Sequence, residues 1–174
     1  MIGYDVIHDD HAVAEATARV EETSARAIEI ACRHIAIHEP FANAPSDVGD
    51  RDLTDFARIG SARLVSREEL LKMAERNLAR FVAALRARAA IYPQLDAVRL
   101  SVLAHVALVI RISGVLDCKP LWTAIHNCRW DDAADELMLT KWPEKARNDG
   151  DRRRMLELAR MMRTGDEPAQ LVSA

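Results

Sequence analysis

The chain has 174 residues, of which 49% are hydrophobic and 29% are charged, and its formal net charge is −3. This length is enough for one domain with a hydrophobic core, and the composition is typical of globular proteins. The small net charge gives no general electrostatic reason to bind nucleic acid. Three cysteines at irregular spacing exclude a disulfide framework and a cysteine-based metal site. We therefore expect neither a nucleic-acid partner nor a bound metal.

The sequence also carries no recognisable targeting segment. Residues 1–16 lack the basic region followed by an apolar run that a secretory signal peptide requires. The most apolar stretch, Val102–Ile112, contains His105 and Arg111 and is too short to span a bilayer. The expectation from sequence is a protein that is cytoplasmic as synthesised and has no transmembrane segment.

The first third of the chain divides into an ordered and an irregular part. Asp10–His38 is rich in alanine and contains no glycine or proline, which predicts one long helix. Pro40–Gly60 then brings prolines and glycines together with several aspartates, a composition typical of loops. This is the only stretch in which we expect a small β element.

A helical pattern returns at Ser66, which forms a capping box with Glu69. The helix that follows has its apolar residues near one stripe, and Pro93 lies beyond its end. Leu95–Ile112 is apolar almost all round, which predicts the central buried helix, with Gly114 as its stop signal.

Three shorter helices complete the predicted mainly α fold, at Lys119–Asn127, Trp130–Leu139 and Arg152–Arg163. Gly165 is a typical helix stop. We divide the chain into an N-terminal helical extension, a loop-rich lobe, a helical domain and a tail, over residues 1–38, 39–65, 66–165 and 166–174.

A set of landmark residues runs in order from the central helix to the last one: Leu95-Asp96-Ala97-Val98-Arg99, Gly114, Arg129-Trp130-Asp131-Asp132-Ala133-Ala134, Trp142 and Arg163-Thr164-Gly165. In this order they resemble the phage-type lysozymes, the bacteriophage muramidases of glycoside hydrolase family 24. The resemblance is strongest over residues 64–165. It implies a lysozyme-like helical domain with a long linking helix and a small, divergent N-terminal lobe. We expect Trp130 and Trp142 to be packing anchors rather than sugar platforms.

The resemblance also implies an activity. Members of this family hydrolyse the β-1,4 bond between N-acetylmuramic acid and N-acetylglucosamine in peptidoglycan, without a cofactor. Inverting glycosidases use one carboxyl group as a general acid and a second one to hold the attacking water, about 6.5–9.5 Å apart. Carried over, Glu39 at the end of the first predicted helix is the candidate acid.

The second catalytic carboxylate is ambiguous in this sequence. Counting forward from Glu39 puts Thr54 at the threonine position of the family, and the aspartate position then falls beside Asp47. Aligning on Ile59-Gly60 makes Asp52 the partner instead, and the same acidic run holds Asp50 and Asp55 as further candidates. The Thr-Ile-Gly-Tyr-Gly-His strand of the family is absent as such, so both alignments stay open.

Two further residues are candidates for binding substrate or supporting the acid. His105 falls where the family often has an asparagine that faces the cleft, although a lone histidine on an apolar helix is also a typical core residue. Arg154, which stands in an arginine cluster near Glu157, matches an arginine that supports the catalytic glutamate. By this resemblance Arg154 would pair with Glu39.

Two functions are compatible with these observations. The first is an endolysin-type muramidase that acts on glycan strands after release by a holin or delivery in a particle. The second is a catalytically lapsed lysozyme-like protein that acts as a glycan-binding or protein-interaction module. The length of the Asp10–His38 helix favours a protein partner, because the first helix of the family is much shorter.

Overall fold

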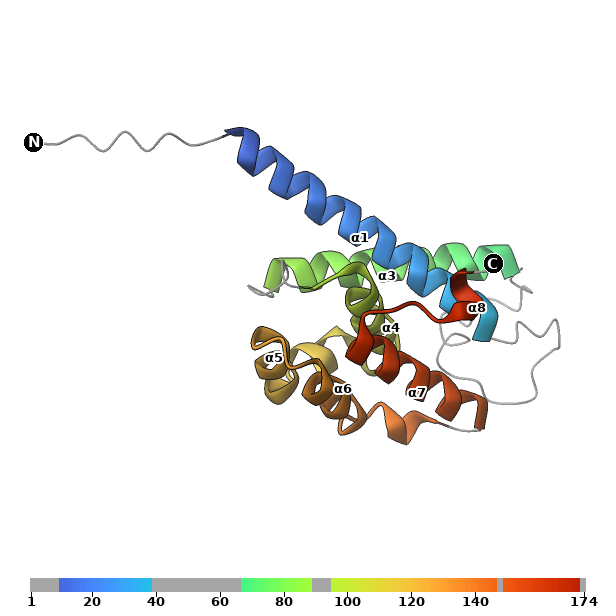
Figure 1. Cartoon of the computed structure of the whole chain (residues 1–174). Helices are drawn as coiled ribbons and strands as arrows, with labels where there is room; N and C mark the ends of the chain where they lie inside the picture. The colour runs from blue at the N-terminus through green and yellow to red at the C-terminus, as the bar shows by residue number, and fades with distance from the viewer. Residues whose placement is uncertain (1–9, 39–66, 89–94, 147–148, 173–174) are drawn as a thin grey trace, which may run out of the picture.

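The computed structural model describes residues 10–38, 67–88, 95–146 and 149–172. Within these ranges the fold is mainly α, as predicted, and contains no strand. Figure 1 shows the helices and their labels. They are α1 (Asp10–His38), α3 (Arg67–Arg88), α4 (Ala97–Leu116), α5 (Lys119–His126), α6 (Trp130–Met138), α7 (Asp149–Thr164) and α8 (Ala169–Val172), with a 3-10 turn, η2 (Pro143–Lys145), before α7.

The centre of the protein is α4, which packs against α1, α3 and α7 (Figure 1). Asp96 caps its N-terminus by accepting a hydrogen bond of 2.8 Å from the backbone N–H of Arg99. Every residue from Leu100 to Ala107 is buried, which confirms the predicted central helix. Among the described helices only α4 is long and apolar enough to cross a membrane. Half of its apolar stretch is buried within the protein.

The end of α4 differs from the sequence prediction. The helix does not stop at Gly114 but continues to Leu116, after a kink at Arg111. Arg111 has φ 69° and ψ 159°, a region that is almost restricted to glycine. A Cβ atom at Gly114 would lie only 3.1 Å from Cγ1 of Ile110. The glycine therefore permits close packing across the kink instead of ending the helix.

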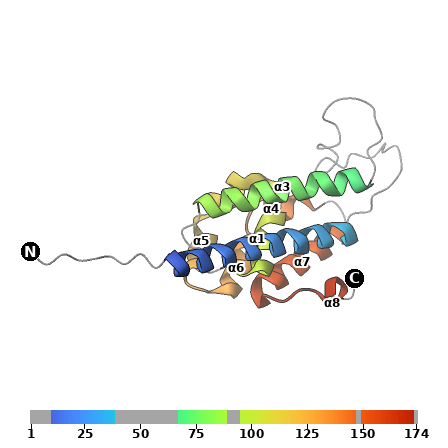
Figure 2. The same cartoon turned by 90° about the horizontal axis from the view of Figure 1, so that it is seen from above.

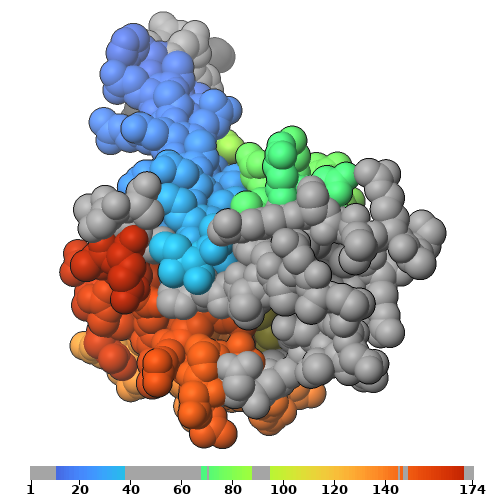
Figure 3. Space-filling model, turned by 90° about the vertical axis from the view of Figure 1, so that its right-hand side faces the viewer, coloured from blue at the N-terminus to red at the C-terminus, as the bar shows by residue number. Residues whose placement is uncertain are grey.

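The long helix α1 begins and ends at the residues predicted. It lies beside α3, as Figure 2 shows from above. Its second half joins the core, because Ala27, Ile30, Ala31 and Ile35 are at most 1% exposed. Residues 11–19 are all exposed, and this first half of the helix extends beyond the body of the protein (Figures 1 and 3).

The last helices follow the predicted order with shifted ends. α7 starts at Asp149, three residues before the predicted start, so Asp149 and Asp151 occupy its first turn. Carboxylates there complement the positive end of the helix dipole. The segment predicted as a tail contains α8 and contacts α1, because Glu167 accepts hydrogen bonds from Arg26 and Arg33 at 2.6 and 2.8 Å.

Candidate functional site

Several of the landmark residues, though not Gly114 or Trp142, lie around the C-terminal end of α7, where Arg99 is the central side chain. The guanidinium of Arg99 donates from Nε to the carbonyl oxygen of Met162 at 2.9 Å and from Nη2 to that of Arg163 at 3.3 Å. It also pairs with Asp96 and lies 4.0 Å from the ring centroid of Trp130. A cation at this helix end offsets the partial negative charge of the last carbonyl groups, and the stacking adds a cation–π contact.

The same landmarks connect α7 to α6. Arg163 forms ion pairs with Asp131 and Asp135 at 2.9 and 2.8 Å. Gly165, at φ 76°, ends α7 and lies against the guanidinium of Arg99. Trp142 is 2% exposed and belongs to the core, as predicted. Arg99 joins α7 to α4 and Arg163 joins it to α6, so the direct role of these contacts is architectural.

A second group of polar side chains lies where the last turns of α1 meet α4 and α7. We call His34, His105, Asp151, Arg154 and Glu157 the polar cluster. Nε2 of His34 lies 3.2 Å from Oε2 of Glu157, and because a carboxylate only accepts, the histidine donates. The ring of His105 meets that of His34 edge-on, with 5.2 Å between centroids and 84° between planes. The two histidines are 0% and 4% exposed.

Arg154 brings a positive charge to this cluster. It lies three residues before Glu157, so both side chains project from one face of α7. Its Nη2 donates to Oδ1 of Asp151 at 3.0 Å, and 14% of its side chain is exposed. Burial lowers the pKa of the Arg154 guanidinium, because desolvation disfavours the charged form. An arginine nevertheless keeps its proton, so the cluster holds a fixed cation.

Burying such a group of charged and polar side chains lowers the stability of a fold. Removing charged side chains from water costs several kcal/mol per ion before pairing offsets it, and perturbed ionisable groups concentrate at functional sites. The polar cluster combines a guanidinium, two imidazoles and two carboxylates, and α1 contributes His34 from its last turns (Figure 3 looks onto this end of the helix). It can orient a carboxyl group and stabilise its ionised form.

Two of the predicted site residues lie near the contact between α1 and α7: His105 meets the ring of His34, and Arg154 lies one helical turn before Glu157, which His34 contacts. His105 and Arg154 both belong to the polar cluster, although their roles stay predictions. Glu39, Asp52 and Thr54 lie outside the described residues, as do the alternative carboxylates Asp47, Asp50 and Asp55. Glu39 directly follows the last residue of α1 in the sequence.

The sequence prediction missed His34. A single histidine on the buried stripe of an alanine-rich helix has the spacing of a core residue, and nothing in its neighbours marks it. Glu157 was noted only as a companion of the arginine cluster. The contact between the two joins residues 123 positions apart, and this separation hides it from local patterns.

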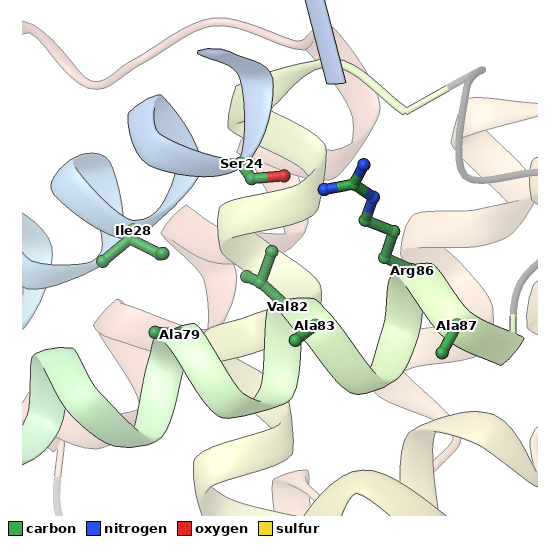
Figure 4. Close-up of a pocket in the computed structure, with 7 residues that line it drawn as sticks. All are labelled: Ser24, Ile28, Ala79, Val82, Ala83, Arg86 and Ala87. Atoms are coloured by element: carbon green, nitrogen blue, oxygen red, sulfur yellow. The ribbon is translucent and has the colours of Figure 1, made fainter. Parts of the chain in front are cut away.

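Other features of the described residues offer less chemistry. No three His, Cys, Asp or Glu side chains in the described ranges are placed to hold a metal ion. A groove of about 420 Å³ lies between α1 and α3 (Figure 4). Its lining is mainly small and apolar, with Arg86 as its charged member: Ser24, Ile28, Ala79, Val82, Ala83, Arg86 and Ala87. Such a lining suits packing better than catalysis.

Comparisons with protein-family models, curated proteins and solved structures find no match to this chain. A functional assignment therefore rests on the chain's own residues. The two features that carry most information are the polar cluster and the exposed first half of α1.

Proposed function

We propose that the protein is a peptidoglycan N-acetylmuramidase with the architecture of a phage-type lysozyme. In this proposal α3 is the linking helix, α4 the central helix of the larger lobe, and residues 39–65 the small divergent lobe. The observation that carries the proposal is the polar cluster, because its contacts hold His34, which lies in the last turns of α1, five residues before Glu39. A catalytic acid at position 39 would directly follow a helix whose last turns are held in place by buried polar contacts.

Glu39 is the general acid in the proposed mechanism. It protonates the glycosidic oxygen as the bond to the N-acetylmuramic acid breaks, and it becomes a carboxylate in that step. Arg154 supports it by orienting the carboxyl group and by stabilising the negative charge that develops. The His34–Glu157 hydrogen bond supports it indirectly, because it ties the last turns of α1 to α7.

The second carboxylate holds the water that attacks from the opposite face of the sugar. Asp52 fills this role in one alignment. In the other alignment Asp47 fills it, and Thr54 stands at the family's threonine position. No cofactor takes part in this chemistry. The substrate is the glycan strand of peptidoglycan, which a cytoplasmic enzyme reaches after release by a holin or delivery in a particle.

The landmark contacts give independent support to the proposed architecture. Some of the residues that match the family in order, though far apart in the sequence, meet in one cluster, in which Arg99 joins α4 to the end of α7 and stacks on Trp130. A chance sequence match would give no reason for these residues to be in contact.

The test is clearing of outer-membrane-stripped Gram-negative cell walls, measured by loss of turbidity. We expect the wild type to clear the walls and Glu39→Gln to be slower by about 100-fold or more, the usual contribution of a general acid. Glu22→Gln is the matched control, because Glu22 is an exposed glutamate on α1, and it should clear at the wild-type rate. Asp52→Asn and Asp47→Asn then identify the second carboxylate.

Full clearing by a folded Glu39→Gln variant would refute the role of Glu39. Absence of clearing by the folded wild type would refute the enzyme and favour the second candidate, a catalytically lapsed lysozyme-like module. The observation that favours this alternative is the exposed first half of α1. Co-sedimentation with intact peptidoglycan then distinguishes a glycan-binding module from one that binds only protein.

A further inference from the structure

The segment that follows α7 returns to α1, where charged side chains hold it. Glu167 is 14% exposed and accepts hydrogen bonds from Nη2 of Arg26 at 2.6 Å and from Nη2 of Arg33 at 2.8 Å. The carboxylate of Glu29 lies 2.8 Å from Nη1 of Arg26 and 3.6 Å from Nε of Arg33. Each arginine thus contacts both carboxylates. We call this closed ring of Arg26, Glu29, Arg33 and Glu167 the ionic clamp.

A closed network holds its members better than a single surface pair does. An isolated exposed ion pair contributes little to stability, because two long side chains lose conformational freedom for one contact. In the ionic clamp each side chain makes two contacts, and Glu167 is the least exposed of the four. α8 follows two residues later and also contacts α1 (Figure 1). The clamp therefore joins the end of the chain to a helix 134 positions away.

The ionic clamp and the core contact two different faces of α1. Arg26, Glu29 and Arg33 are spaced by three and four residues, so they share one face of the helix. The buried stripe from Ala27 to Ile35 lies roughly 130° around the helix from that face, at 3.6 residues per turn. Contacts on a single face leave rotation of a helix about its axis the least restrained motion. Contacts on a second face oppose that rotation.

We propose that Glu167 is a positioning residue for the general acid of the proposed function, on which this inference rests. By opposing rotation of α1, Glu167 sets the direction in which the chain leaves His38, the last residue of the helix, toward Glu39. A rotation of about 10° displaces a group at the outer radius of a helix, about 5–6 Å from the axis, by about 1 Å. A displacement of about 1 Å in an active site costs about 100-fold in rate.

The first test measures the clamp itself and does not depend on activity. Glu167→Gln removes the charge and keeps the shape of the side chain. Asp166→Asn is the matched control, because Asp166 is exposed and has no ion pair among the described residues. We expect amide hydrogen exchange in residues 26–38 to be about tenfold faster or more in Glu167→Gln and unchanged in Asp166→Asn, because local opening governs exchange. Unchanged exchange in Glu167→Gln would overturn the proposal.

The second test measures the kinetics of fragment release from purified peptidoglycan. We expect Glu167→Gln to lower kcat about tenfold or more and to leave KM within about twofold, because the substrate contacts stay the same while the acid is misplaced. A kcat equal to that of Asp166→Asn would overturn the positioning role, even with faster exchange. A wild type without activity would refute the proposed function and the positioning role together, and the exchange result alone then decides whether Glu167 holds α1.

A double variant identifies the contact through which Glu167 acts. Arg33→Gln removes the other side of the same hydrogen bond. If the two side chains act through this contact, the double variant should lose no more kcat than the more affected single variant, because coupled residues are not additive. Losses that multiply would show that Glu167 acts independently of Arg33 and would contradict the proposal. Circular dichroism verifies that every variant keeps its helices.

Discussion

Gly165 gives the sharpest test of the contacts that hold α4 against α7. Its φ of 76° lies in the left-handed region, which an alanine adopts only with strain. A Cβ atom added there would lie 2.7 Å from Nη1 and 3.0 Å from Cζ of Arg99. The Gly165→Ala change therefore strains the backbone and displaces the guanidinium that binds the last carbonyl groups of α7.

The magnitude follows from these two effects. The left-handed conformation costs an alanine about 1–2 kcal/mol. Displacing Arg99 weakens its hydrogen bonds to Met162 and Arg163, and hydrogen bonds to charged groups contribute about 1.5–3 kcal/mol each when fully lost. The lower backbone entropy of alanine in the unfolded chain returns about 0.4–1 kcal/mol. We expect a net loss of about 2–3 kcal/mol in the free energy of unfolding.

Urea unfolding followed by circular dichroism measures this loss. Gly150→Ala is the matched control, because Gly150 lies in the helical first turn of α7 and is exposed; alanine there should be neutral or stabilise by up to about 1 kcal/mol. Arg99→Met removes the steric conflict. Adding Gly165→Ala to the Arg99→Met variant should therefore cost only the backbone strain. A Gly165→Ala variant as stable as the wild type would refute the reasoning.

Two further predictions concern the kink and the cysteines. Arg111→Gly should raise the free energy of unfolding, measured by thermal denaturation, by about 1 kcal/mol. Glycine relieves backbone strain of about 1–3 kcal/mol at φ 69°, and its larger entropy in the unfolded chain offsets only part of that gain. Arg111→Ala is the control and should give no such gain. Burial, with Glu75 nearby, raises the pKa of the Cys32 thiol to about 11. At pH 8 iodoacetamide should therefore modify the exposed Cys128 well before Cys32. Mass spectrometry of timed samples measures the two rates, and equal rates would contradict the prediction.

Local patterns predicted most of the helical fold. The run without glycine or proline defined α1, and the apolar stretch around Leu103 defined the buried α4. The departures have tertiary causes. Glycine is a typical helix stop, but Gly114 lies inside α4, where the absence of a side chain permits close packing against Ile110. The kink falls instead at Arg111, which no helix-stop preference identifies.

The candidate site was only partly accessible to sequence reasoning. Arg154 and His105 were identified through the resemblance; His105 packs on His34, and Arg154 lies one turn before Glu157 on α7. His34 could not be identified, because its significance depends on Glu157 and His105, which come from other helices. Buried polar contacts between distant helices leave no periodic signal in a single sequence.

The measurement that most directly tests the central claim is the chemical identity of the new chain ends in digested peptidoglycan. Purified peptidoglycan is incubated with the wild type or Glu39→Gln, and the soluble fragments are reduced and analysed by mass spectrometry. The account predicts fragments that end in reduced N-acetylmuramic acid with the wild type and almost none with the variant. Fragments that end in N-acetylglucosamine, or equal yields from the two proteins, would contradict it.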